Sequence, residues 1–284
     1  MGGMNTIEIP DNLLFYKYRP GAGDNDMHLE AITKCHVWFE NPSNFNDPFD
    51  CAPTPSERST EEIHAVIQRA MSNTENPHMT AEIRESIQKK YAENPAEAVK
   101  TVEQLSGRPE YVTAFMSNYV VYSLAKSPLN RLMWSHYAHY HQGFSIEFDF
   151  SKDLLKDPRL RTIQDWDDDF GPLPVIYQEN RPSIHNNNGN QADVLRTKDS
   201  VWEYENEFRI VKEGNRRLVS FDPDYLSSII LGANASNELK TKIQDAVYEF
   251  NRDRQTTIKV YYAELSPTKY DLMIPGHPTY ENIN

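Results

Sequence analysis

The pattern of apolar and polar residues predicts short strands on both sides of a helical block. Apolar and aromatic clusters at 13–18 and 37–39 are broken by Pro-Gly and Asn-Asp-Pro turns, which indicates two short strands around a helix near 29–32. Residues 144–150 alternate between apolar and polar, as a half-buried strand does. The later part of the chain predicts a strand over 202–211, short strands near 217–221, 228–231, 258–264 and 269–274, and a helix over 237–251.

Residues 57–126 carry a helical pattern instead. Ser59 and Glu62 form a capping box, and apolar residues then follow at helical spacing. Further helices are expected near 80, 95 and 109. Because none of the chemical motifs lies here, we assign 57–120 as a helical insertion or lid on an α+β core built from 1–56 and 121–284. The polar, asparagine-rich stretch 180–198 is expected to be a mobile loop.

Composition excludes several classes of protein. The 284 residues carry a net charge of −13, which argues against a protein that coats duplex DNA by neutralising its phosphates. An aromatic content of 11% supplies a core and argues against global disorder. The sequence has neither a long apolar run nor a signal-peptide pattern, and it has only two cysteines. We therefore expect a cytoplasmic protein with no membrane span.

Two clusters near the start of the chain could contribute to a site. In a strand, Lys17 and Arg19 share one face, and the tyrosines on either side of Lys17 share the other. The cationic pair could hold a phosphate or carboxylate, and the alternative is a solvated edge. Residues 44–50 favour a turn that Phe45 and Phe49 pin to the core; Asn46 or Asp50 pointing into a site is the alternative.

A third cluster lies at 133–143, where we expect a helix that Gly143 ends. His136 and His139 would share a face, but no acidic residue has an obvious place beside them as a metal ligand. A pocket for a flat ligand, lined by a tryptophan, a histidine and a tyrosine, is the better interpretation.

The fourth cluster, at 202–210, is the most distinctive. Alternation in a strand would place three glutamates and an arginine on one face: Glu203, Glu205, Glu207 and Arg209. Three neighbouring carboxylates repel one another unless the face is solvated or a ligand lies there. The cluster is therefore either a wet strand face or a Glu-x-Glu pair that binds a ribose hydroxyl and orients a nucleophile.

Taken in order, four motifs resemble a large bacterial and phage family of unknown function. They lie at 16–18, 45–50, 133–143 and 202–209. More loosely, the aromatic-basic-aromatic first strand followed by an Asn-Asp-Pro turn is similar to the start of the ADP-ribosyltransferase fold. This likeness implies a mixed or antiparallel β core around NAD⁺. Lys17 stands where the pattern has His or Arg, and it lacks the bidentate fork of arginine.

The same likeness implies roles for individual residues. Glu205 or Glu207 would be the catalytic carboxylate and Ser123 the residue on a middle strand. The NAD⁺-binding residues, with no metal ligand among them, would be Lys17, Tyr18, Arg19, Asn46, Asp47, Trp134, His136 and Tyr137. Trp134 and Tyr137 would pack the nicotinamide, and cations near the first strand would hold the pyrophosphate.

The leading hypothesis is an NAD⁺-dependent ADP-ribosyltransferase of the toxin or phage-defence type. It would use NAD⁺ as a substrate, modify a protein or nucleic-acid acceptor, and be compatible with a neutralising partner. The alternative is a non-catalytic sensor or interaction module whose acidic face docks a basic partner. A third hypothesis is a metal-dependent nuclease or hydrolase built from His136, His139 and acids such as Asp47 or Asp50.

Overall fold

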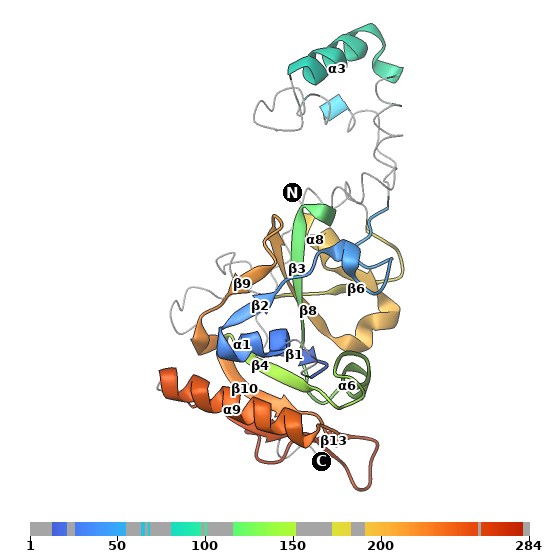
Figure 1. Cartoon of the computed structure of the whole chain (residues 1–284). Coiled ribbons are helices and arrows are strands. Elements are labelled where there is room, and N and C mark those ends of the chain that lie inside the picture. Colours follow the sequence, from blue (N-terminus) through green and yellow to red (C-terminus); the bar gives the residue numbers. More distant parts are fainter. Residues whose placement is uncertain are drawn as a thin grey trace.

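The computed structural model has an α+β core built on one mixed sheet (Figure 1). It describes residues 13–21, 26–54, 64–65, 68, 81–97, 100, 116–151, 172–182, 191–254 and 257–280. The seven strands lie in the order β11-β10-β4-β1-β3-β8-β5, and only the β10–β11 pair is parallel. Their bounds are β1 Leu14–Arg19, β3 Tyr119–Ala125, β4 Phe144–Asp149, β5 Leu173–Pro174, β8 Glu207–Glu213, β10 Leu226–Leu231 and β11 Lys259–Tyr262.

The described residues also form three two-stranded ribbons and a set of mostly short helices. The ribbons are β2 His36–Trp38 with β9 Leu218–Ser220, β6 Ile176–Gln178 with β7 Thr197–Asp199, and β12 Glu264–Leu265 with β13 Leu272–Met273. The α-helices are α1 Glu30–Thr33, α3 Ala81–Glu93, α6 Arg131–Tyr137, α8 Gln191–Leu195 and α9 Asn237–Arg254. The 3-10 helices are η1 Asp26–Leu29, η2 Pro42–Asn44, η4 Ser200–Glu205 and η5 Pro223–Tyr225. No described helix is both long and apolar enough to cross a membrane.

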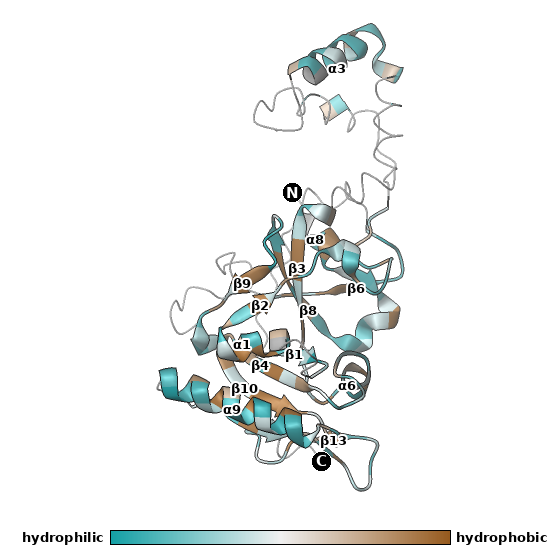
Figure 2. Ribbon diagram, in the orientation of Figure 1, coloured by the Kyte–Doolittle hydropathy of each residue, from teal (hydrophilic) through white to brown (hydrophobic). Residues whose placement is uncertain are grey.

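The two faces of the sheet bury different hydrophobic clusters, because successive strand residues point to opposite sides. Phe15 belongs to the larger cluster, which α1 and α9 cover. Tyr16 and Tyr18 belong to the smaller cluster, together with Trp134 of α6 and Ile274 near the C-terminus. Figure 2 shows apolar residues concentrated on the sheet and polar residues on the outer face of α9.

The sheet opens between β1 and β3. β1 pairs with β4 along its whole length but with β3 at a single position, Tyr16 opposite Ala125. Lysine side chains bridge the gap: the Lys17 ammonium donates to the Ser123 carbonyl at 2.7 Å, and the Lys126 ammonium donates to the Leu14 carbonyl at 2.9 Å. We call this opening the β1–β3 seam.

Most predicted elements are confirmed, including the short strands near 217–221, 228–231, 258–264 and 269–274 and the helices near 29–32, 80 and 237–251. The strand predicted over 202–211 is confirmed only from Glu207 onward, because Ser200–Glu205 form the 3-10 helix η4. The helical block does not reach residue 126, because 119–125 form the central strand β3. The capping box at 59–62 lies outside the described residues, and whether the block acts as a lid stays a prediction.

Two further expectations are wrong. β4 is buried on both faces, because the second hydrophobic cluster covers the side that carries Ser145 and Glu147. The expected loop over 180–198 instead ends in α8 and β7, because Val194 and Leu195 are fully buried and fix the segment to the core. Residues 183–190, which carry the asparagine run, lie outside the described residues.

Candidate functional site

A cleft of about 420 Å³ lies where β1 and β3 separate. Residues from both strands line it, together with residues of α6, η4, β7, β8, η2 and the loop that follows η2. The lining consists of Tyr16, Lys17, Tyr18, Asn44, Phe45, Asn46, Asp50, Ser123, Leu124, Ala125, Met133, His136, Tyr137, Lys198, Glu205 and Glu207. Its volume is within the range of small-molecule sites, which is about 300–1,000 Å³.

Most residues expected in one site do line this cleft. The expected residues it brings together are Lys17, Tyr18, Asn46, Ser123, His136, Tyr137, Glu205 and Glu207. The expected residues outside the lining are Arg19, Asp47 and Trp134.

Trp134 belongs to the core. Its side chain is fully buried, its indole N–H donates to the Pro128 carbonyl at 2.7 Å, and Tyr18 packs edge-on against it. A side chain with no exposed surface and a satisfied N–H cannot stack on a ligand. The expectation that Trp134 packs a nicotinamide ring is therefore wrong.

Asp47 stabilises a turn. One carboxylate oxygen accepts from the Trp202 indole at 2.8 Å, and the other accepts from the Phe49 amide at 2.9 Å. Phe49 is 63% exposed and does not attach the turn to the core. Asp50 is buried and attaches the turn instead, because both of its oxygens accept hydrogen bonds from Arg209.

The expected row of carboxylates on one strand face does not form. Glu203 and Glu205 lie in η4, and Asn206 adopts a left-handed conformation with φ of 44° before β8 begins at Glu207. Glu203 is therefore exposed, whereas Glu205 and Glu207 are buried beside the cleft. Glu205 and Glu207 are therefore not on a solvated strand face. Their mutual repulsion is offset because cations pair with both carboxylates.

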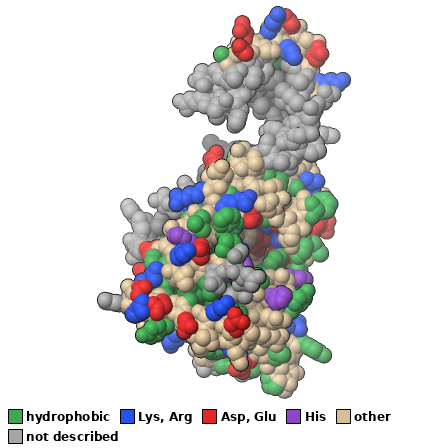
Figure 3. Space-filling model, viewed as in Figure 1, with side chains coloured by type: hydrophobic (Ala, Val, Ile, Leu, Met, Phe, Trp, Pro, Cys, Tyr) green, Lys and Arg blue, Asp and Glu red, His purple; other side chains and the backbone are tan. Residues whose placement is uncertain are grey.

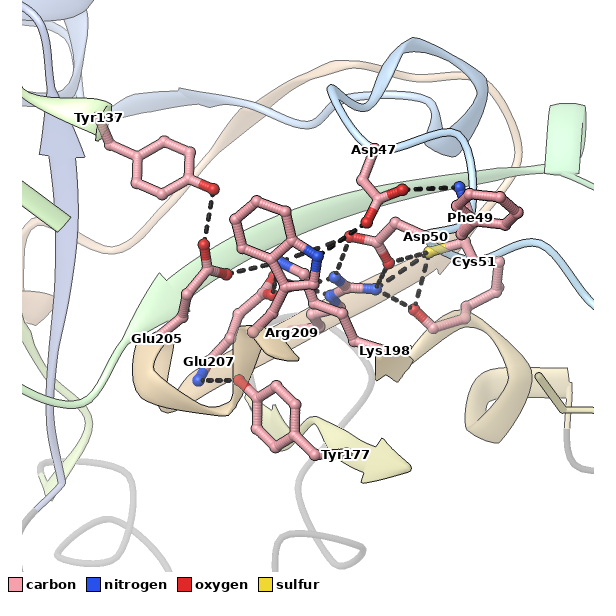
Figure 4. Close-up of polar contacts among 12 residues, drawn as sticks. Asp47, Phe49, Asp50, Cys51, Tyr137, Tyr177, Lys198, Glu205, Glu207 and Arg209 are labelled. Atoms are coloured by element: carbon pink, nitrogen blue, oxygen red, sulfur yellow. Dashed lines mark hydrogen bonds and ion pairs between the residues drawn. The ribbon is translucent and has the colours of Figure 1, made fainter. Parts of the chain in front are cut away.

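Lys198 of β7 is the centre of this ion-pair network. Its ammonium lies 2.5 Å from a Glu205 oxygen, 3.0 Å from a Glu207 oxygen and 3.6 Å from an Asp50 oxygen. The second Glu205 oxygen accepts from the Tyr137 hydroxyl at 2.7 Å, so both oxygens of that carboxylate are held (Figure 4). Burial alone would lower the pKa of Lys198, but the neighbouring carboxylates raise it above its ordinary value.

Arg209 of β8 is the second cation of the network. Its guanidinium is fully buried and donates to both oxygens of Asp50 and both oxygens of Glu207. Burial opposes ionisation of Glu207, yet Arg209 and Lys198 lower its pKa to about 2. Glu207 is thus a fixed structural anion, and Glu205, held by Tyr137 and Lys198, is the better candidate for chemistry.

Lys17 differs from the other two cations of the site. Burial, together with the nearby Arg19, lowers the pKa of its ammonium to about 7, although Glu207 acts in the opposite direction. Its ammonium donates to the Ser123 carbonyl and lies 4.7 Å from the centre of the Tyr122 ring. Lys17 can therefore change charge near neutral pH inside the cleft.

The expected histidine pair is not formed. α6 ends at Tyr137, and His139 then adopts a left-handed conformation with φ of 47°, so the two histidines do not share a helical face. His136 lines the cleft, and His139 is exposed. Within the described ranges, no group of three or more histidine, cysteine or acidic side chains is arranged to hold a metal ion.

A second buried network supports the wall of the cleft. The Glu147 carboxylate accepts from the Tyr16 hydroxyl at 2.8 Å and from the hydroxyls of Ser227 and Ser228. The His277 ring lies 2.8 Å from the same carboxylate. These contacts join the C-terminal segment to β4 and fix Tyr16 in the lining.

The sequence analysis missed Lys198 and the Glu147–His277 pair. Lys198 lies in a stretch that is polar overall, and the only local signal against a loop was the apolar pair just before it, Val194 and Leu195. Glu147 occupies a polar position of an alternating strand, so its burial depends on the distant C-terminal segment.

Comparison with known proteins identifies one matching family model. Residues 133–210 match the model of a family described as a protein of unknown function, DUF2971. The matched range runs from the start of the cluster in α6 to β8, and it includes Lys198, Glu205, Glu207 and Arg209. Neither the curated proteins nor the solved structures contain a match to the chain.

Proposed function

We propose that the protein is an NAD⁺-dependent ADP-ribosyltransferase, in which Glu205 is the catalytic carboxylate. One observation carries this proposal. A cation of the first strand, a serine of a middle strand and a late glutamate line the same cleft, namely Lys17, Ser123 and Glu205. Lys17 and Ser123 are 106 positions apart along the chain, so the fold and not local sequence joins them.

The proposed reaction breaks the glycosidic bond of NAD⁺. Nicotinamide leaves with the bonding electron pair, and an oxocarbenium ion develops on the ribose. The Glu205 carboxylate accepts a hydrogen bond from a ribose hydroxyl and stabilises the developing positive charge. Tyr137 and Lys198 hold this carboxylate in place before the substrate arrives. The nucleophile of the acceptor then bonds to the anomeric carbon and loses its proton to water.

The site gives less support to the alternatives. An acidic docking face needs exposed carboxylates, whereas Glu205 and Glu207 are 3% and 5% exposed. A metal-dependent nuclease or hydrolase would bring His136, His139 and Asp47 or Asp50 to one ion. The left-handed His139 does not share a face with His136, and the described residues contain no group of three such side chains arranged to hold a metal.

The decisive experiment measures nicotinamide release from NAD⁺ by chromatography, with and without a pool of proteins and nucleic acids as acceptors. Glu205→Gln keeps the size of the side chain and removes its charge, so the rate should fall by about 10²–10³. Glu203→Gln is the matched control, because Glu203 lies in the same short helix but is exposed and outside the lining. If the protein releases no nicotinamide, or if Glu205→Gln keeps the full rate, the proposal is wrong.

The toxin or phage-defence role belongs to the same proposal. A chain that consumes NAD⁺ or modifies an essential acceptor should slow the growth of a bacterial host. Expression of the wild-type chain should therefore reduce colony formation, and Glu205→Gln should restore it at an equal protein level. Equal colony counts for the two chains would contradict the role.

A further inference from the structure

The inference that follows rests on the proposed function and names the class of substrate for the same cleft. We infer that the cleft selects a flat, positively charged N-glycoside and does not require its phosphates, so that nicotinamide riboside alone is a sufficient ligand.

The first argument is the balance of charge around the cleft. Three buried carboxylates, those of Asp50, Glu205 and Glu207, face two cations that are already paired with them, Lys198 and Arg209. This ion-pair network therefore carries one more negative than positive charge. The other cation of the lining, Lys17, bonds to the Ser123 carbonyl and forms no ion pair with these three carboxylates. In a buried site such an imbalance favours a cationic ligand and disfavours an anionic one.

The second argument is the lack of a cation suited to a pyrophosphate among the described lining residues. Arginine forms the bidentate contacts typical of phosphate recognition. Arg209 is fully buried and holds Asp50 and Glu207, and Arg19 lies outside the lining. Lys17 does line the cleft, but its ammonium already donates to the Ser123 carbonyl, and burial lowers its pKa to about 7. The expectation that cations of the first strand hold the pyrophosphate is therefore not supported.

The third argument concerns size and shape. A cleft of about 420 Å³ suits one nucleoside better than a dinucleotide. Aromatic side chains approach it from two elements, Phe45 from the loop after η2 and His136 with Tyr137 from α6. Aromatic faces bind flat rings and attract cations. The carboxylate of Glu205, held beside Tyr137, is placed to bind hydroxyls of an attached ribose.

Calorimetric titration with matched ligands tests this inference. The probes are nicotinamide riboside, its reduced and uncharged form, and NAD⁺. We expect nicotinamide riboside to bind within about tenfold of NAD⁺, because the phosphates add little. The reduced riboside should bind at least about tenfold more weakly, because its uncharged ring loses the attraction of the positive ring to the aromatic side chains and the carboxylates. If NAD⁺ binds more than a hundredfold more tightly than the riboside, or the reduced riboside binds as tightly as the cation, the inference is wrong.

Two variants locate the effect. Glu205→Gln should weaken the binding of nicotinamide riboside and leave that of the reduced form nearly unchanged, whereas Glu203→Gln should alter neither. Glu205→Gln weakening both forms equally would contradict charge selection.

This experiment also separates the inference from the proposed function, because heat of binding does not depend on turnover. If nicotinamide riboside binds selectively while no ligand releases nicotinamide, the transferase proposal fails and the inference stands. If NAD⁺ is cleaved but the riboside does not bind, the reverse holds.

Discussion

At the scale of single residues, Glu205 and Glu207 have different bonding partners although only one position separates them. Glu207 bonds to Arg209 and Lys198, both of which are buried. Breaking one partner of such a pair costs about 3–5 kcal/mol, because the remaining charge is left uncompensated. We expect Glu207→Gln to lower the free energy of unfolding by that amount in urea titration. Glu203→Gln should leave it unchanged, and a normal unfolding midpoint for Glu207→Gln would contradict the network.

The Glu207 carboxylate should also make the stability of the fold depend on pH in the acidic range. Its folded pKa of about 2 lies below the unfolded value of about 4.3. The unfolded chain therefore binds the proton first, so the contribution of Glu207 is complete above pH ~4.3 and is lost as the pH falls toward 2. Unfolding followed by circular dichroism between pH 3 and 6 should show stability falling with acid. Glu207→Gln should remove part of that slope, and an identical slope in the variant would disprove the assignment.

Lys17 should make the stability of the fold depend on pH above neutrality. Its folded pKa of about 7 lies below the unfolded value of about 10.4, so between these values the unfolded chain binds the extra proton. The contribution of Lys17 to stability therefore rises with pH across this window. Lys17→Met should flatten that rise in urea titrations at pH 7, 8 and 9. A variant whose stability changes with pH as in the wild type would contradict a lowered pKa.

At the scale of elements, the C-terminal segment should be needed for stability. His277 is fully buried and lies 2.8 Å from the Glu147 carboxylate. His277→Ala leaves that buried carboxylate without one of its partners, which costs about 1–3 kcal/mol. Thermal unfolding should show a lowered midpoint, whereas Tyr270→Ala, at a position 91% exposed, should show none. Equal midpoints for the two variants would mean that the segment is not structurally coupled to β4.

The elements that the sequence predicted well are those whose pattern is local. The pattern of apolar residues within β10, β11 and α9 is enough to predict each element, and all three lie where the sequence predicted them. The alternation over 203–209 fits a strand equally well, but Asn206 turns the chain with a positive φ and only the second half pairs with β3. Lys198 could not be assigned from sequence, because its three carboxylate partners come from two other segments, the turn that carries Asp50 and the stretch from Glu205 to Glu207.

At the scale of the whole molecule, the charges on the face drawn in Figure 3 differ in arrangement from the paired charges of the cleft. Figure 3 shows cationic and anionic side chains interspersed on the visible face. The net charge of −13 therefore predicts solubility and repulsion from nucleic-acid phosphates, but not the chemistry of the site. Glu205 and Lys198 are buried and only weakly screened by salt. Ligand binding should accordingly change less than tenfold between 50 and 500 mM NaCl in calorimetry, and a larger loss would indicate that surface charge guides the ligand.

The β1–β3 seam has a practical consequence for labelling the protein. Lys17 and Lys126 bridge it through their amines, so reagents that acylate lysine would remove the charged donors that join the two halves of the sheet. The natural thiols offer no substitute, because Cys35 and Cys51 are both buried. A fluorescent dye is better attached through maleimide chemistry to a cysteine introduced at the exposed position 270, far along the chain from either lysine.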